Sequence, residues 1–257
     1  MFAIERVRII KNYLLKDQKV SVAKLSTLLD VTEVTIRRDL EKLEKEGFLK
    51  RTHGGAVLLN YSGESLYDES IEDEQIELYQ EIADTAYHLV SDYDSILLTN
   101  GPINAFIARS LAKRNNLTVV TNDIKIAQEF SGSQSNNLIL LGGDLDEHAL
   151  FGQMAIDNLK NFAFQHVFLE IDALNNTVGM MVSSVKKATF IQQALKLADS
   201  VTVVCLSTSF GGKSLYRIGP LTLAHRILTD SKLDDEYKNY IFNSNIPIFT
   251  SIDIYEE

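Results

Sequence analysis

A run of basic side chains lies near the start of the sequence, in the stretch VTEVTIRRDLEKLEKEGFLKRTHGG of residues 31–55. Arg37 and Arg38 are adjacent, and Lys50 and Arg51 lie near the end of the same run. A guanidinium donates two parallel hydrogen bonds to guanine or to a phosphate, and an ammonium neutralises phosphate charge. The run therefore has the chemistry that nucleic-acid binding requires, although the solvated charges of an ordinary interaction module would have the same composition.

The charge of the chain is divided unevenly. The 257 residues have a formal net charge of -10, yet residues 1–60 hold 12 Lys and Arg against 8 Asp and Glu. The first 60 residues thus carry a net charge of +4, and the remainder carries a net charge of −14. This asymmetry favours a module at the N-terminus that binds a polyanion, attached to an acidic body.

Two helices are expected before the basic run. Val7, Ile10 and Leu14 recur at helical spacing and predict a first helix over residues 4–17. Ser21 is placed to act as the N-cap of a second helix, VAKLSTLLD. The residues of this second helix that we expect to face inward are Ala23, Leu25, Leu28 and Leu29.

A third helix, capped by Thr32 and running to about Glu46, carries the paired arginines. Its apolar stripe, at positions i, i+4 and i+7, consists of Ile36, Leu40 and Leu43. At 100° per residue the opposite face holds Val34, Arg38 and Lys45, with Thr35 and Arg37 on the flanks. Glu41 also lies on this face, where its carboxylate would repel a phosphate.

A hairpin is expected after the third helix, because two short runs surround a turn in FLKRTHGGAVLL. Helix, tight turn, helix and hairpin is the order of a winged helix-turn-helix, whose recognition helix enters the major groove. We therefore expect Thr35, Arg37 and Arg38 to contact the groove and the phosphates. The residues expected to position the DNA backbone are Ser21, Thr32, Lys50, Arg51, His53, Gly54 and Gly55.

The segment TIRRDLEKLEKEGFLKRTHGGA resembles a family signature. It is similar to the DeoR-type bacterial transcriptional repressors of sugar metabolism, which read T-[IV]-R-R-D-L, then a Leu, a Gly, a basic residue and H-G-G-A. The resemblance covers residues 4–57. It implies a sequence-specific regulator that binds double-stranded operator DNA, and a repressor of a carbohydrate operon that a small metabolite releases. A single small module would bind the operator weakly, so we expect a homodimer or homotetramer on repeated half-sites.

The rest of the chain is predicted to fold as an α/β body. We expect a winged helix-turn-helix over residues 1–57, a polar and acidic linker over 58–74, and a body for effector sensing and oligomerisation over 75–257. Continuous apolar runs separated by helical stretches indicate a mainly parallel, doubly wound sheet. The seven expected strands are SILLT (95–99), LTVVT (117–121), LILLG (138–142), HVFLE (166–170), VTVVC (201–205), RILT (226–229) and IPIFT (246–250).

Ligands of such sheets bind beyond the carboxyl ends of the strands. Small and polar residues follow several of the expected strands, and they form a candidate pocket for a polar metabolite. Gly, Asn, Asp and Ser are also the usual residues of ordinary strand-to-helix turns, so a purely structural interpretation stands beside the functional one. The candidate effector-site residues are Asn100, Gly101, Thr121, Asn122, Gly142, Gly143, Gly152 and Lys213.

The body resembles the C-terminal domain of the same family, which is similar to ribose-5-phosphate isomerase and binds phosphorylated sugars or related metabolites. LTVVTNDIKIAQEF and LILLGGDLDEHALFGQMA resemble its motifs L-T-V-[IV]-T-N and L-x-G-G…G, and HVFLE takes the place of F-[LIF]-G. Gly101-Pro102-Ile103 stands where the family has Gly-Thr-Thr for phosphate, and residues 206–211 lack the Asp and Lys of D-x-[ST]-K-[FLV]-G. Lys213 or Arg217 would then have to supply the positive charge that a sugar phosphate needs.

Other classes of protein are disfavoured. No stretch approaches 18 consecutive apolar residues and the N-terminus is not a signal peptide, so we expect a cytoplasmic protein without membrane contact. Cys205 is the only cysteine, the five histidines lack metal-ligand spacing, and SFGGKS lacks the first glycine of a P-loop, so no cofactor or metal is expected. We predict that the chain is not an enzyme. A ligand-free oligomerisation scaffold and, less favoured, a phosphosugar-isomerase-like enzyme remain as alternatives for the body.

Overall fold

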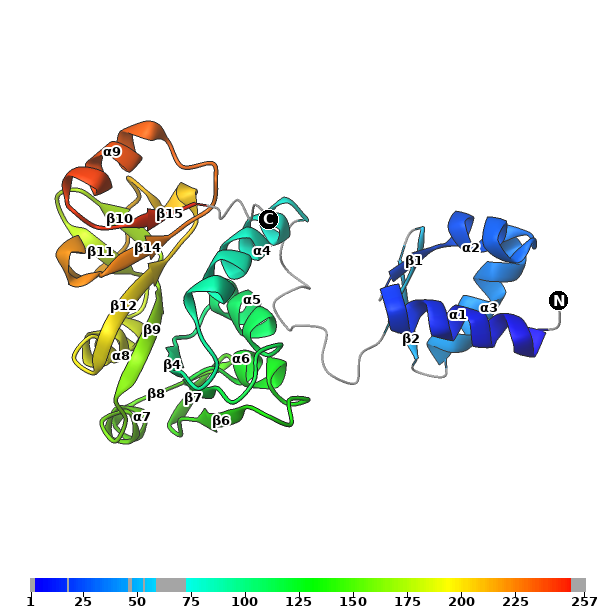
Figure 1. Ribbon diagram of the computed structural model, residues 1–257, viewed down its shortest axis with the longest axis horizontal. Coiled ribbons are helices and arrows are strands. Elements are labelled where there is room, and N and C mark those ends of the chain that lie inside the picture. The colour runs from blue at the N-terminus through cyan, green and yellow to red at the C-terminus, as the bar shows by residue number, and fades with distance from the viewer. Residues whose placement is uncertain (1–2, 18, 46–47, 53, 59–72, 251–257) are drawn as a thin grey trace. The chain divides into compact units, whose positions relative to one another are not determined.

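The computed structural model describes residues 3–17, 19–45, 48–52, 54–58 and 73–250. By its internal contacts the chain divides into two compact units, Met1–Glu64 and Ser65–Glu257 (Figure 1). Most of the predicted linker, together with His53, lies outside the described residues.

The N-terminal unit combines three helices with a three-stranded antiparallel sheet. Ser21 caps the second helix, because its Oγ accepts a hydrogen bond from the Lys24 backbone N at 3.1 Å. The first strand is very short and was not predicted; it places the strands in the order β1-β3-β2. The elements are α1 (Ala3–Asp17), β1 (Lys19–Ser21), α2 (Val22–Leu29), α3 (Glu33–Lys45), β2 (Leu49–Thr52) and β3 (Gly55–Leu58).

The core of this unit confirms the predicted stripe of the third helix and corrects that of the second. Ile36, Leu40 and Leu43 are fully buried, as expected. In α2 the prediction that Ala23 and Leu28 face inward is wrong, because both are exposed. The residues that pack inward from α2 are spaced i, i+3, i+7 instead, and they are Val22, Leu25 and Leu29.

The second unit is built on a seven-stranded sheet in which every neighbouring pair of strands is parallel. Each of its strands lies within or overlaps one of the seven predicted runs, and their order is β15-β14-β12-β9-β4-β5-β6. The strands are β4 (Ser95–Leu98), β5 (Thr118–Thr121), β6 (Asn137–Leu140), β9 (Phe164–Glu170), β12 (Ala198–Val204), β14 (Arg226–Leu228) and β15 (Ile248–Phe249).

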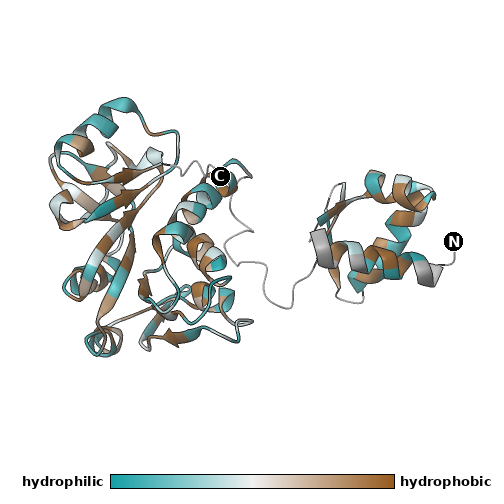
Figure 2. Cartoon of the chain, in the orientation of Figure 1, coloured by the Kyte–Doolittle hydropathy of each residue, from teal (hydrophilic) through white to brown (hydrophobic). Residues whose placement is uncertain are grey.

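Helices cover both faces of this sheet, as its apolar strands require. Alternate strand residues supply two separate cores: Ile96 and Leu98 belong to one, and Leu97 belongs to the other. The first core includes α4 (Asp73–Leu89), α5 (Pro102–Leu111) and α6 (Ile124–Glu129), and the second includes α7 (Gln153–Leu159), α8 (Val185–Ala194) and α9 (Asp235–Asn243). Figure 2 shows hydrophobic residues along the strands between these layers. The doubly wound fold is confirmed.

Short antiparallel strands outside the parallel sheet were not predicted. β7 (Asp144–Asp146) and β8 (Ala149–Phe151) form a hairpin, whereas β10 (Ala173–Asn175), β11 (Gly179–Val182) and β13 (Tyr216–Gly219) form a second sheet. Cys205 is fully buried after β12, as expected of a small core residue. Within the part of the chain that the structure describes, no helix has the length and hydrophobicity to cross a bilayer.

Candidate DNA-binding surface and effector site

A buried ion pair fixes the third helix on the first. Asp39 of α3 accepts hydrogen bonds from Nε of Arg6 and, at 3.1 Å, from its Nη2, and both side chains are only 10% exposed. The hydrogen bond from Arg6 to the Asp39 carboxylate raises the pKa of Arg6 in spite of burial, so the guanidinium stays charged. Asp39 is therefore a positioning residue on the inner side of α3, away from the outer face.

The start of α3 is held by a pair of threonines. The hydroxyl oxygens of Thr32 and Thr35 lie 3.0 Å apart, and the Thr35 backbone N donates to Thr32 Oγ1 at 3.4 Å. In the preceding turn Asp30 adopts a left-handed conformation with φ 51°, and the Ser26 hydroxyl donates to the Val31 carbonyl at 2.6 Å. These contacts fix the angle at which α3 leaves α2. Thr35 is thus tied to the cap, and its predicted contact with DNA remains a proposal.

The exposed face of α3 carries the two arginines. Arg37 donates to Glu33 at 3.0 Å, while Arg38 has no hydrogen bond or ion pair with the described residues. Glu41, whose charge argued against DNA contact, is bonded to Lys45 at 3.0 Å, and this bond is the main reason that the pKa of Glu41 is lowered. Lys45 therefore offsets the negative charge of Glu41, which would otherwise repel a phosphate at this face.

The hairpin of β2 and β3 brings more basic residues beside this helix. Lys50 and Arg51 are exposed on β2, and the Arg51 backbone N donates to Glu44 of α3 at 2.9 Å. Gly54 is exposed, but Gly55 is buried: a Cβ at Gly55 would lie 1.9 Å from the Val20 carbonyl of β1. Packing of β1 on β3 therefore requires glycine at position 55, and the structure gives no reason to place it on DNA.

A surface hollow of about 290 Å³ lies between α3 and this hairpin. Two arginines border it, one from the helix and one from the hairpin. A hollow with two cations on its rim is suited to a backbone phosphate. Its lining residues are Val22, Arg37, Leu40, Arg51, Thr52 and Gly55.

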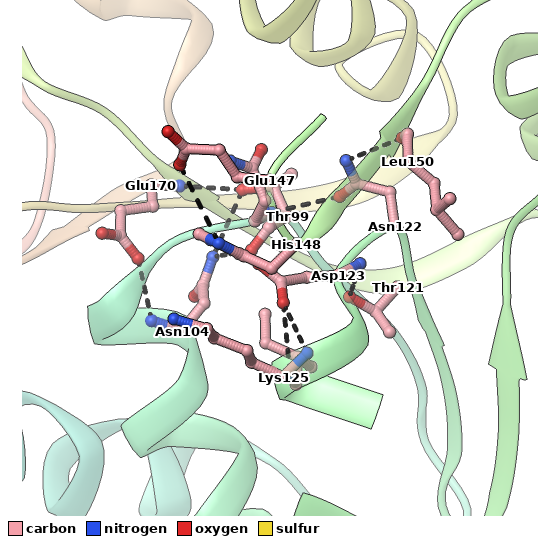
Figure 3. Close-up of polar contacts among 12 residues, drawn as sticks. Thr99, Asn104, Thr121, Asn122, Asp123, Lys125, Glu147, His148, Leu150 and Glu170 are labelled. Carbon is pink, nitrogen blue, oxygen red and sulfur yellow. Dashed lines mark hydrogen bonds and ion pairs between the residues drawn. The ribbon is translucent and has the colours of Figure 1, made fainter. Parts of the chain in front are cut away.

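In the second unit a polar cluster lies where the strand order reverses. β5 and β6 lie on one side of β4, and β9 lies on the other, so the loops after β4 and β9 diverge, as at the ligand-binding crevice of open α/β sheets. Thr99 follows β4, and its hydroxyl oxygen accepts a hydrogen bond from the Glu170 backbone N at 3.0 Å. Figure 3 shows these residues with Asn104, whose Nδ2 donates to the Thr99 carbonyl at 2.8 Å.

The carboxyl group of Glu170 occupies the N-terminus of α5. Its Oε2 accepts a hydrogen bond from the Asn104 backbone N at 2.9 Å, and a Cβ at Gly101 would lie 2.2 Å from its carboxyl carbon. Burial raises the pKa of Glu170 to about 7, although Lys187 and the backbone N–H groups of Asn104 and Ile103 act in the opposite direction. A helix N-terminus commonly binds an anion, and in this chain the side chain of Glu170 occupies that position.

Asn100 and Asn122 connect this cluster to the next strand. The Asn100 backbone N donates to Asn122 Oδ1 at 3.1 Å, and Asn122 Nδ2 donates to the Leu150 carbonyl at 3.2 Å. Thr121 is fully buried and accepts a bond from the Asp123 backbone N at 3.1 Å. The buried Oδ1 of Asn100 accepts no hydrogen bond from any described residue. The structure thus brings Asn100, Gly101, Thr121 and Asn122 together.

The remaining predicted residues make no hydrogen bond with these four among the described residues, although Leu141, which precedes Gly142, donates from its backbone N to the Thr121 carbonyl at 2.8 Å. Gly143 packs against the Phe151 carbonyl, at 2.3 Å from an added Cβ, and Gly152 packs against Asp144, so both shape the β7–β8 hairpin. Gly142 contacts Met154 of α7 in the same region. Lys213 is exposed after β12, and none of its contacts with described residues joins it to the cluster.

A second polar group, which was not predicted from the sequence, lies beside Glu170 and consists of Asp172, Ser183 and Lys187. Lys187 of α8 is 8% exposed and donates to Asp172 at 2.8 Å, and Ser183 donates to the same carboxylate from N and Oγ, both at 2.6 Å. Against the effect of burial, Lys187 and Ser183 lower the pKa of Asp172. A lysine on the buried stripe of α8, with Ala188 and Ile191, was the available signal.

Glu170 makes the stability of the chain depend on pH. Its pKa is raised from 4.5 to about 7 on folding, so this group stabilises the fold fully below pH 4.5, and that contribution is lost as the pH rises through 7. The loss amounts to about 3 kcal/mol. We expect Glu170→Gln to remove this pH-dependent loss. Between pH 4.5 and pH 8 the free energy of unfolding of the variant should therefore rise by about 3 kcal/mol relative to that of the wild type.

The measurement is urea unfolding of both full-length proteins across that pH range. His166 and Asp172, whose pKa values are lowered in the fold, titrate with the opposite sign but are common to both proteins, and the difference between the two curves isolates Glu170. A constant difference at every pH would show that Glu170 is not a buried group with a raised pKa.

A winged helix-turn-helix with exposed arginines, followed by a sheet domain with a polar cluster at its carboxyl edge, defines a DNA-binding regulator with a separate sensing domain. Family models match both parts: the DeoR-like helix-turn-helix domain over residues 6–61 and the DeoR C-terminal sensor domain over residues 74–231. The chain belongs to the DeoR family of transcriptional regulators.

Relatives of the chain agree with this assignment. The HTH-type transcriptional regulator YulB of Bacillus subtilis is 31% identical over 91% of each chain. The lactose phosphotransferase system repressor of Lactococcus lactis is 30% identical over 86% of this chain and 88% of that protein. Both are regulators rather than enzymes. Among solved structures, the chain is similar to ribose 5-phosphate isomerase A of Methanocaldococcus jannaschii. The alignment covers 53% of this chain and 55% of the isomerase, with 15% sequence identity and a TM-score of 0.40.

Proposed function

We propose that the chain represses a carbohydrate-utilisation operon and that a small polar metabolite releases it from the operator. The observation that carries the DNA-binding part is the exposed face of α3, on which Arg37 and Arg38 project beside the basic hairpin. In this proposal the other DNA contacts come from the N-terminal unit, where the contributing residues are Ser21, Thr32, Thr35, Lys50, Arg51, His53 and Gly54. A sugar operon is supported by the lactose repressor to which the chain is similar.

The effector is proposed to bind at the carboxyl edge of β4 and β5. Asn100 Oδ1 supports this placement, because a buried acceptor without a partner is uncommon and a ligand hydroxyl would satisfy it. Glu170 holds the N-terminus of α5, where a phosphate would meet a carboxyl group. We therefore favour a hydroxyl-rich group at this point; a sugar phosphate would have to place its phosphate elsewhere, near Lys213 or Arg217.

Release follows from a shift in population. An effector that binds the non-operator arrangement more tightly lowers the operator affinity by that difference in free energy, about 1–3 kcal/mol in typical cases. One small DNA-binding unit would bind weakly, so we propose a homodimer or homotetramer acting on repeated half-sites in the bacterial cytoplasm.

A thermal-shift panel of sugars, polyols and sugar phosphates on the full chain tests the sensing part. A ligand at about 100 Kd adds about 2.7 kcal/mol, and for a domain of this size that raises the melting temperature by roughly 5–10 °C. Asn100→Ala and Asn122→Ala are expected to lose the shift, whereas Lys160→Ala, a surface control, keeps it. A compound that shifts the wild type and both asparagine variants equally would contradict the proposed site.

The ligand-free scaffold is the second candidate for the sheet domain. The observation in its favour is that hydrogen bonds join Thr99, Asn104 and Glu170 to one another, although the buried Oδ1 of Asn104 accepts none from the described residues. A panel that leaves the melting temperature unchanged, with operator binding intact, would favour this candidate.

A further inference from the structure

The recognition helix exposes one branched apolar side chain on its first turn. Val34 is the second residue of α3 and is 62% exposed, whereas Ile36, Leu40 and Leu43 of the same helix are fully buried. Val34 thus contributes nothing to the core of its unit. It lies where the N-terminal residues of a recognition helix meet the edges of base pairs.

Arg38 lies one turn further along the same face. Residues i and i+4 of a helix are neighbours, and four residues advance the axis by about 6 Å, which is less than two base-pair steps of about 3.4 Å. Val34 and Arg38 can therefore contact the same base pair or two base pairs that are close neighbours.

The two arginines are not equivalent. Arg37 is bonded to Glu33 at 3.0 Å and borders the hollow between α3 and the hairpin, where Arg51 also lies. Arg38 is exposed and has no hydrogen bond or ion pair with the described residues, so its guanidinium is available for a new partner. The geometry assigns Arg37 to the sugar-phosphate backbone and leaves Arg38 for the bases.

The chemistry of the groove then determines what each side chain can read. Thymine alone among the four bases presents a methyl group in the major groove, and an apolar side chain recognises it by contact. Guanine presents N7 and O6, which match the fork of an arginine. We propose that Val34 packs on the methyl group of a thymine and that Arg38 donates to N7 and O6 of a guanine within about two base pairs of it. This inference rests on the DNA-binding function and adds to it a named base-reading pair.

Single-atom changes in the DNA test the pair directly. The full chain first selects its preferred duplex from a pool of random 30-base-pair duplexes. In the selected duplex each thymine is then replaced by deoxyuridine, which removes only the methyl group, and each guanine by 7-deazaguanine, which removes only N7. Affinities are measured by fluorescence anisotropy at one salt concentration for the wild type and for Val34→Ala, Val34→Thr and Arg38→Ala.

We expect one thymine per half-site at which deoxyuridine weakens wild-type binding by about fivefold. Val34→Ala should weaken binding to the unmodified duplex by a similar factor and be insensitive to deoxyuridine at that thymine. Val34→Thr keeps a branched methyl group and should keep the sensitivity. Arg38→Ala should weaken binding by about 10- to 100-fold and be insensitive to 7-deazaguanine at a guanine within about two base pairs.

Two results would contradict the proposed base-reading pair while leaving DNA binding intact. In the first, no deoxyuridine substitution weakens wild-type binding; in the second, deoxyuridine weakens binding of the Val34→Ala variant as much as that of the wild type. Because Val34 and Arg38 are exposed, the variants should fold, and circular dichroism checks this. A chain that selects no sequence at all would overturn the DNA-binding function itself, which is a distinguishable result.

Discussion

Replacing both Arg37 and Arg38 by alanine should lower operator affinity by about a thousandfold or more. An arginine that binds a base or a phosphate contributes about 1–3 kcal/mol, and the proposed dimer would lose four such groups. Both side chains are exposed, so the fold should not change. The measurement is fluorescence anisotropy of the full-length variant on the duplex that the wild type selects.

The matched control removes the same charge from the sheet domain. Lys160 and Lys196 are exposed there, and their double alanine variant should bind operator as the wild type does. The arginine variant should also have a shallower dependence of affinity on salt, because fewer phosphates are neutralised. If both double variants bound alike, the helix α3 would have no part in recognition.

Asp39→Ala should destabilise the N-terminal unit by about 3 kcal/mol, because it leaves the Arg6 charge buried without its partner. A unit the size of Met1–Glu64 is stable by only about 3–10 kcal/mol, so the variant should lose a large part of its stability. At roughly 5 °C per kcal/mol for a small unit, its melting temperature should fall by about 15 °C. Scanning calorimetry of the full chain measures this, and the transition of the sheet domain should not move.

Glu33→Ala is the matched control for this prediction. It removes an ion pair on the same helix, but the pair with Arg37 is about half exposed, and such pairs contribute little. A melting temperature of the N-terminal unit that falls equally in both variants, or in neither, would contradict the role given to the Arg6–Asp39 pair.

The larger elements could be predicted from the sequence because their residues are neighbours in the chain. Seven apolar runs gave seven parallel strands, and the spacing of Ile36, Leu40 and Leu43 gave the inner face of α3. In α2 the spacing predicted wrongly that Leu28 faces inward, since consecutive leucines fit more than one stripe and only packing decides between them.

The missed features depend on residues that are distant in the chain. β11 pairs with β13 across more than thirty residues, and strands of three or four residues have too little pattern to predict. The Arg6–Asp39 pair was not predicted, because the two residues are 33 apart in the chain. Glu170 ends a predicted strand, yet its place at the N-terminus of α5 depends on a contact across 66 residues. Lys213 was proposed from nearness in sequence alone, and no contact with described residues joins it to the cluster.

The claim that this chain recognises an operator by its base sequence, through α3, is tested most directly by a ratio of two affinities. The duplex that the full chain selects from random sequence is compared with a scrambled duplex of equal length and composition, at the same salt concentration. We expect repeated half-sites in the selected duplex and binding about a thousandfold tighter than to the scrambled one. A selection without a common sequence, or equal affinity for the two duplexes, would contradict the claim.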